Sequence, residues 1–132
     1  ELVHASMLVG WQWFAIQLEP NSQIMIFAYH WESEHMGSIT NEQGETVELG
    51  PKDYSLDILE WWTSPHTQRR YPSKWHLKTG EYDLTITPLV ADQELDEAWL
   101  WIKYWEGACG VTGSHQGSAY VELVGYHRKH WL

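Results

Sequence analysis

Residues 11–31 read WQWFAIQLEPNSQIMIFAYHW, and this stretch decides the fold. Two runs rich in β-branched and aromatic residues, 11–18 and 24–31, flank the segment 19–23. The Pro, Asn and Ser residues of that segment favour a hairpin loop. The stretch therefore predicts two antiparallel β-strands joined by a short loop.

The two faces of this hairpin are both apolar. Trp11 and Trp13 fall on one face of the first strand, while Phe14 and Ile16 fall on the other. A strand with one face in water should instead alternate apolar and polar residues. We therefore expect something else to cover the outer face of the hairpin.

Further β-rich runs follow the hairpin, and Gly, Pro or Asn turns separate them. These runs span residues 37–40, 45–49, 54–62, 75–77, 82–87, 104–112 and 118–127. The acidic segment 91–101 predicts either a turn of helix or an irregular crossing. About eight to ten short strands with hairpin connections are typical of an all-β, antiparallel up-and-down barrel, and a β-sandwich is the alternative. We predict a closed barrel that forms a single domain over residues 1–132.

The charge balance excludes several classes of partner. The chain has 8 Lys and Arg against 18 Asp and Glu, which gives a net charge of −10. A protein that binds nucleic acids or anionic membrane surfaces needs clustered positive charge, so neither is expected as a partner. No apolar run approaches the roughly 20 residues of a membrane span. The chain begins at Glu1 without Met, which indicates a processed product or a fragment and leaves cytoplasm, periplasm and secretion equally open.

The sequence predicts no metal and no cofactor. Its eight His residues lack a metal-binding spacing, and His127 and His130 flank the cationic pair Arg128–Lys129. A Gly-rich phosphate loop and a Gly-x-Ser-x-Gly elbow are also missing. The single cysteine, Cys109, cannot form a disulfide within the chain and has no basic neighbour. We interpret it as a small buried core residue rather than a nucleophile.

The aromatic composition favours a ligand cavity or an aromatic interface over simple core filling. The chain has ten Trp and seven Tyr but only two Phe. Trp and Tyr carry a polar tip, so they suit walls that are apolar yet wet at one end. The candidate ligand-binding residues are Trp11, Trp13, Tyr29, Trp31 and Tyr120. The residues of the first hairpin could stack on a polyene and stabilise a carbocation, or they could pack against a neighbouring domain.

Several strings along the chain carry a family resemblance. They are GWQWF at 10–14, IQL at 16–18, YPSKW at 71–75, PLVADQE at 88–94, YWEG at 104–107, Gly113, and GSAYVELVGY at 117–126. In this order the chain resembles the C-terminal lipocalin-like domain of the carotenoid 1,2-hydratase (hydroxyneurosporene synthase) and AttH-like family, from about residue 8 to 127. Members of that family typically carry two lipocalin-like barrels. The resemblance implies that this chain is the second barrel, and that a partner barrel or a second copy covers the hairpin 11–31.

The resemblance implies an elongated apolar ligand, such as a terpenoid or polyketide, and hydration or cyclisation of an unactivated alkene. That chemistry needs a neutral carboxylic acid to deliver a proton to carbon. Burial against aromatic walls raises the pKa of a carboxyl group, so the group keeps its proton. Glu106 and Glu122 are the candidates, and Glu106 is favoured because Trp105 lies beside it. Either carboxyl could instead accept hydrogen bonds or pair with Lys103 or Arg128.

One residue departs from the pattern of the family, and one alternative function stays open. The position between the first two tryptophans is often Asp in the family pattern, and here it is Gln12, which cannot supply a proton. The domain could also be architectural and only brace a partner barrel.

We interpret the acidic run Asp92, Glu94, Asp96 and Glu97 as a solvated crossing rather than a metal site.

Overall fold

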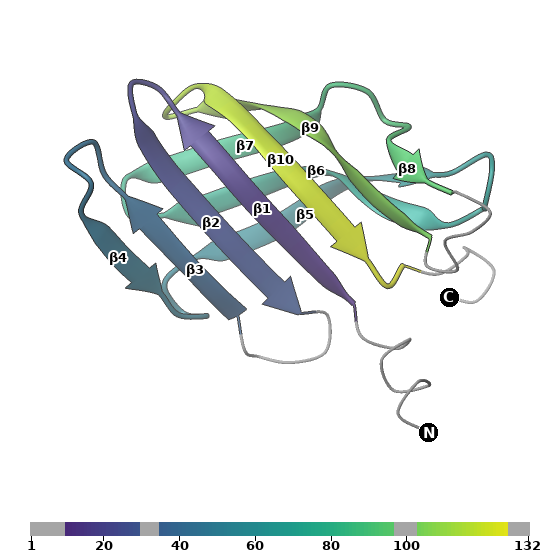
Figure 1. Cartoon of the computed structure of the whole chain (residues 1–132), viewed down its shortest axis with the longest axis horizontal. Helices are drawn as coiled ribbons and strands as arrows, with labels where there is room; N and C mark the ends of the chain where they lie inside the picture. Colours follow the sequence, from purple (N-terminus) through teal and green to yellow (C-terminus); the bar gives the residue numbers. More distant parts are fainter. Residues whose placement is uncertain (1–9, 30–34, 97–102, 127–132) are drawn as a thin grey trace.

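Ten antiparallel strands, joined by turns and loops, make up the fold (Figure 1). The structure is a computed structural model that describes residues 10–29, 35–96 and 103–126. The strands are β1 (Trp11–Leu18), β2 (Ser22–Tyr29), β3 (His35–Thr40), β4 (Thr46–Leu49), β5 (Ser55–Thr63), β6 (Arg70–Thr79), β7 (Tyr82–Pro88), β8 (Glu94–Leu95), β9 (Tyr104–Gly113) and β10 (Gly117–Val124). The predicted all-β class is confirmed. In the described residues, no helix has the length and hydropathy that a membrane crossing requires.

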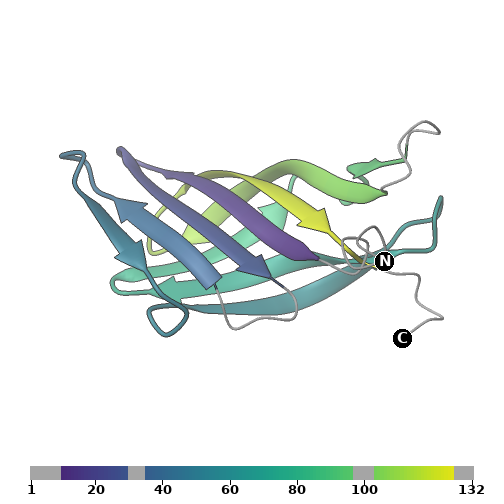
Figure 2. The ribbon, with the colours of Figure 1, turned by 60° about the horizontal axis from the view of Figure 1, so that its bottom comes forward.

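The strands belong to one curled sheet rather than to two separate sheets. Their order is β4-β3-β2-β1-β10-β9-β7-β6-β5, and β8 pairs with β9 outside this path. The sheet folds over so that β5, β6 and β7 form a layer that faces the layer of β1 to β4 and β10 (Figure 2). The antiparallel, lipocalin-like curl is as predicted, but the expected closure is wrong. Among the described strands, β4 and β5 are the two ends of the sheet and do not pair with each other.

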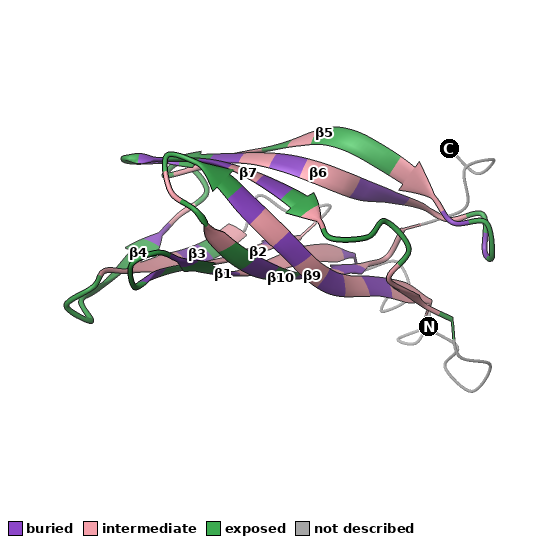
Figure 3. Cartoon of the chain, turned by 90° about the horizontal axis from the view of Figure 1, so that it is seen from above, coloured by how far each residue is buried: buried purple, intermediate pink, exposed green. Residues whose placement is uncertain are grey.

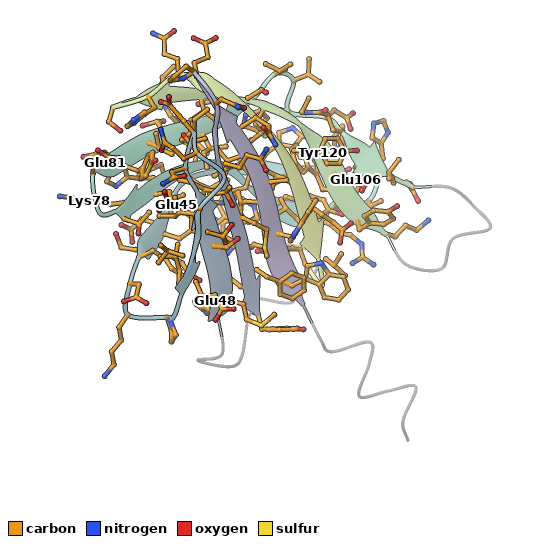
Figure 4. All side chains as sticks on the ribbon, turned by 60° about the vertical axis from the view of Figure 1, so that its left-hand side comes forward. Glu45, Glu48, Lys78, Glu81, Glu106 and Tyr120 are labelled. Carbon is orange, nitrogen blue, oxygen red and sulfur yellow. The ribbon has the colours of Figure 1, made fainter. Side chains whose placement is uncertain are left out.

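The two end strands of the sheet, β4 and β5, carry exposed charged side chains. Glu45 and Glu48 are exposed at or beside β4, at the edge seen in Figure 4. Asp57 and Glu60 are exposed on β5. Charged side chains on an edge strand disfavour pairing with another strand. The sheet is therefore a half-barrel.

The first hairpin forms as predicted, but β2 covers Ser22–Tyr29 where residues 24–31 were expected, and residues 30 and 31 lie outside the described residues. β1 pairs with β2 along its whole length, from Trp11 opposite Tyr29 to Leu18 opposite Ser22. Phe14 and Ile16 are fully buried, whereas Trp11 and Trp13 are only half-buried on the outer face. Burial alternates in the same way along β10 and β9 (Figure 3), because successive residues of a strand point to opposite faces.

The core fills the space between the two layers. Trp75 and Trp105 lie at its centre, with ring centroids 6.5 Å apart, and Phe14 packs edge-on against Trp75 at 5.2 Å. Cys109 is buried in this core, which confirms its prediction. Burial raises the pKa of its thiol to about 12, so it stays protonated and unreactive.

The extent of β6 differs from the sequence prediction. This strand runs from Arg70 to Thr79, although only residues 75–77 were expected. Pro72 is tolerated because that end of β6 pairs with β5 alone, and pairing with β7 begins at Trp75. The described part of the acidic crossing, residues 91–96, contains the two-residue strand β8 and otherwise irregular backbone, which is the irregular crossing of the two predicted alternatives.

Candidate functional site

A cavity of about 500 Å³ opens between the two layers, at the end of the half-barrel where β1 begins. One wall comes from β1, β2 and β3, and the facing wall comes from β5 and the turn before it. The lining residues are Gln12, Ala28, Tyr29, His35, Pro51, Tyr54, Leu56, Ile58, Trp61 and Tyr126. Leu56 and Ile58 reach the cavity because the alternation of β5 turns them inward.

Aromatic rings form the rim of the cavity. Trp61 and Tyr126 meet edge to face at 6.2 Å, and Tyr71 lies behind Tyr126 at 5.8 Å. The guanidinium of Arg70 lies 4.5 Å from the Trp61 ring centroid, a cation–π contact that holds the ring in place. The side chain of Arg69 donates to the Tyr126 carbonyl at 2.6 Å. Several contacts thus hold the residues of the rim in place.

Polar side chains of the lining come from both walls. Tyr54 stacks against His35 with ring centroids 6.0 Å apart, and its buried hydroxyl has no hydrogen-bond partner among the described residues. Burial raises its pKa to about 12, so the group is a neutral donor. On the other wall, the Gln12 side-chain oxygen accepts from Trp75 Nε1 at 2.8 Å.

A second hollow, of about 470 Å³, lies at the opposite end of β1. The loop residues 19–21 and residues 116–118 line most of it, together with Leu18 and Val111. Its lining includes Glu19, Asn21 and Gln116 but no aromatic ring. Ligand sites are mostly apolar with a few placed polar groups, so the aromatic cavity is the better candidate.

The predicted acids lie on the outer face of the sheet, away from this cavity. Glu106 on β9 stands directly opposite Glu122 on β10. Trp11 Nε1 donates to Glu122 Oε1 at 2.8 Å. Figure 4 shows Glu106 next to Tyr120, whose hydroxyl hydrogen-bonds to the Glu106 carboxyl. Trp105 is buried on the inner face, so it does not shield Glu106.

This carboxyl pair is electrostatically strained. The pKa of Glu106 is raised, first by burial and then by the negative charge of Glu122, while the hydrogen bond from Tyr120 opposes the rise. Two carboxylates side by side disfavour each other's charge. The arrangement can therefore hold a proton on Glu106 more readily than an isolated glutamate would.

The predicted ligand-binding residues that the structure describes carry their rings on the outer face. Tyr29 borders the cavity, but its ring meets Phe27 on the outer face at 4.8 Å. Trp11, Trp13 and Tyr120 lie on the outer face, where Trp11 stacks on Phe27 at 6.1 Å. Trp31 lies outside the described residues. Sequence reasoning missed Gln12, Tyr54, Trp61 and Tyr126 as cavity residues, although the inward alternation of 54–58 was a signal for Tyr54.

The acidic crossing differs from its interpretation as simply solvated. Glu94 is half-buried and accepts hydrogen bonds from Ser64 Oγ at 2.5 Å, Thr67 Oγ1 at 2.6 Å and the Tyr71 hydroxyl at 2.7 Å. Hydroxyl donors satisfy the carboxylate in place of water, so Glu94 is an anchor rather than a solvated charge. This anchor ties the β5–β6 turn to the crossing.

The neighbours of Glu94 remain at the surface. Asp92 pairs with His66 at 2.8 Å and Asp96 with Lys103, and both aspartates are exposed. Within residues 10–29, 35–96 and 103–126, no group of three or more His, Cys, Asp or Glu side chains is placed to hold a metal ion. Glu97 lies outside the described residues.

A curled antiparallel sheet with an aromatic cavity at one end defines a lipocalin-like protein. More specifically, the chain belongs to the AttH-like family, whose family model matches residues 2–126. This confirms the resemblance found in the sequence.

Solved structures agree with the assignment. An AttH protein from Nitrosomonas europaea is 34% identical, with a TM-score of 0.81, over 89% of this chain and 39% of that one. Kievitone hydratase from Nectria haematococca is 22% identical, with a TM-score of 0.69, over 90% of this chain and 40% of that one, and it supports the fold alone. The chain thus spans about two fifths of each. No curated protein matches it.

Proposed function

We propose that this chain is a lipocalin-like domain that binds an elongated, apolar small molecule, such as a terpenoid or polyketide, in the cavity between β1–β3 and β5. The observation that carries the proposal is the cavity itself. Its volume of about 500 Å³ falls within the range of small-molecule sites, about 300–1,000 Å³. Leu56, Ile58 and Trp61 supply an apolar wall against which such a ligand buries its surface.

The charge of the lining favours an uncharged ligand. The lining residues that the structure describes include no Asp, Glu, Lys or Arg. A cationic ligand buried there would lose its hydration without gaining a partner of opposite charge. A chain with a net charge of −10 also repels anions at long range.

Tryptophan fluorescence tests the proposal, because Trp61 lines the cavity. Titration with retinol should give saturable quenching at tens of micromolar or below, and a denatured sample should not. Ala28 is buried and lines the cavity, so Ala28→Leu should fill it and weaken binding at least about tenfold, since the added methylenes occupy ligand volume. Ala15→Leu, on the outer face of the same hairpin, is the matched control and should bind as wild type does.

Two results would count against the proposal. One is the absence of saturable quenching by retinol and related polyenes. The other is equal affinity in wild type and Ala28→Leu, with both proteins folded by circular dichroism, because that outcome places the ligand elsewhere.

A second candidate function is catalysis on the outer face, as hydration or cyclisation of an unactivated alkene. The specific observation in its favour is the Glu106–Glu122 pair, where Glu106 has a raised pKa and Trp11 and Tyr120 supply aromatic neighbours. In a longer parent protein, Glu106→Gln keeps the shape and removes the acidic proton. Turnover should fall about 10²–10⁴-fold if Glu106 is the general acid. A loss of only a few-fold would make Glu106 structural.

The architectural alternative rests on the outer face of the first hairpin. Trp11 and Phe27 stack there, and Phe27 meets Tyr29 edge to face at 4.8 Å. Because the chain spans about two fifths of the solved relatives, a second barrel is the proposed occupant of this face. On this alternative the domain braces that barrel, and its own cavity binds nothing.

A further inference from the structure

The lining of the cavity follows one edge strand for most of its length. Tyr54, Leu56 and Ile58 occupy alternating positions at the start of β5, and Trp61 follows after an irregularity in the pairing of β5 with β6. Strand residues advance about 3.3 Å each, so the stretch from Tyr54 to Trp61 covers about 20 Å. One side of the cavity is therefore long and runs beside β5.

The facing wall runs in much the same direction, because its residues form a row across three strands. Gln12 pairs with Ala28, and Ala28 pairs with His35, so the row crosses β1, β2 and β3. These strands cross β5 at an angle (Figure 1), and a row across them therefore runs more nearly along β5. The row meets the β5 side at His35, whose ring stacks on Tyr54 at 6.0 Å. This stack marks one end of a slot, and Trp61 lies at the other end.

The length and the volume of the slot lead to the same size of ligand. An extended chain advances about 1.2 Å per bond, since a residue of three backbone bonds spans about 3.3–3.6 Å, so about 20 Å takes roughly 17 bonds. The volume of about 500 Å³ holds roughly 17 groups of the size of a water molecule, at about 30 Å³ each. A carbon of an apolar chain takes up about as much room as a water molecule. One chain in single file therefore fills the slot.

We propose that the ligand lies lengthwise along β5 as one extended chain of about 16 carbons, with one end beside His35 and the other beside Trp61. This inference rests on the proposed binding function and names the length and the orientation of the ligand. Ala28, Leu56 and Ile58 contact the middle of the chain. Each carbon that enters the slot adds to the affinity until the slot is full, and carbons beyond that number stay in water.

Four prenyl alcohols of increasing length test the inference through displacement of retinol. Geraniol, farnesol, geranylgeraniol and geranylfarnesol have main chains of eight, twelve, sixteen and twenty carbons. Affinity for the wild-type chain should rise at least about tenfold with each step up to geranylgeraniol, because each step buries one more prenyl unit. Geranylfarnesol should bind at most about threefold more tightly than geranylgeraniol, because its last unit finds no room.

Two tryptophan substitutions on β3 then test the orientation of the ligand. His35 lines the slot, whereas Met36 is exposed on the outer face opposite Phe27. His35→Trp should shorten the slot at one end, weaken geranylgeraniol at least about tenfold and leave farnesol within about threefold of wild type. Met36→Trp is the matched control and should leave all four affinities unchanged.

The outcomes separate this inference from the proposed function. If neither retinol nor any prenyl alcohol binds, both fail. If retinol binds but the prenyl alcohols do not displace it, or if affinity keeps rising through geranylfarnesol, the cavity binds ligands but the lengthwise slot is overturned. Equal weakening of farnesol and geranylgeraniol by His35→Trp also overturns the slot. If His35→Trp fails to fold, the length series on wild type decides the question alone.

Discussion

Glu106 and Glu122 face each other as a cross-strand pair on the outer side of β9 and β10. Like charges placed directly opposite each other on a sheet are destabilising. Trp11 donates to one member and Tyr120 to the other, which offsets part of the repulsion. The pair is the clearest electrostatic conflict in the described part of the molecule.

This conflict predicts that Glu106→Gln stabilises the fold at neutral pH. The raised pKa means that the folded state favours protonated Glu106, so its charge penalises folding as the pH rises through the raised pKa. The variant should gain up to about 1 kcal/mol at pH 7. The gain should shrink below the ordinary carboxyl pKa, where wild type is protonated in both states. Urea unfolding at pH 7 and pH 4 measures it.

Glu81→Gln is the matched control, because Glu81 is exposed at the β6–β7 turn (Figure 4). It should change the free energy of unfolding little at either pH. A destabilised Glu106→Gln at pH 7 would show that the carboxylate makes net favourable contacts, which is the opposite of the predicted repulsion.

The anchor at Glu94 predicts a large loss of stability on truncation. Glu94→Ala removes the acceptor of the Ser64, Thr67 and Tyr71 hydroxyls at once. Hydrogen bonds to a charged group contribute more than neutral ones, so the free energy of unfolding should fall by about 2 kcal/mol or more. Chemical denaturation of Asp92→Ala, whose exposed carboxylate pairs with His66, should show almost no change. Equal effects of the two variants would refute the anchor.

The outer face of the first hairpin predicts self-association of this chain on its own. Trp11, Trp13 and Phe27 lie together there, and exposed apolar surface favours association. Sedimentation at increasing concentration should show dimers or larger species, and Trp13→Ser should shift the population toward monomer. A strictly monomeric profile at high concentration would rule out this role for the hairpin.

The sequence predicted the fold class because local patterns encode it. Alternation within residues 11–18 placed Phe14 and Trp13 on opposite faces, as observed, but it did not say which face is the inner one. Cys109 was recognised as a core residue from its small neighbours and the lack of a basic group. The open gap between β4 and β5 was not predictable, because strand patterns carry no information on how far a sheet curls.

The cavity depended on tertiary structure that the sequence does not display. Gln12 and Tyr54 are far apart in the chain, and the curl of the sheet brings them to opposite walls of one cavity. Trp11 and Trp13 were predicted to bind a ligand because of their residue type. The cavity is instead lined by the opposite face of the same strand. Glu94 was interpreted as solvated because its hydroxyl partners lie on a distant turn.

Backbone NMR spectra recorded during a retinol titration test the central claim most directly. If the chain binds its ligand in the cavity, amide shifts should change at lining residues such as Gln12, Ala28 and Leu56 and saturate with the fluorescence signal. Changes confined to the outer face, around Trp13 and Tyr120, or no changes at all, would contradict the claim that this cavity is the binding site.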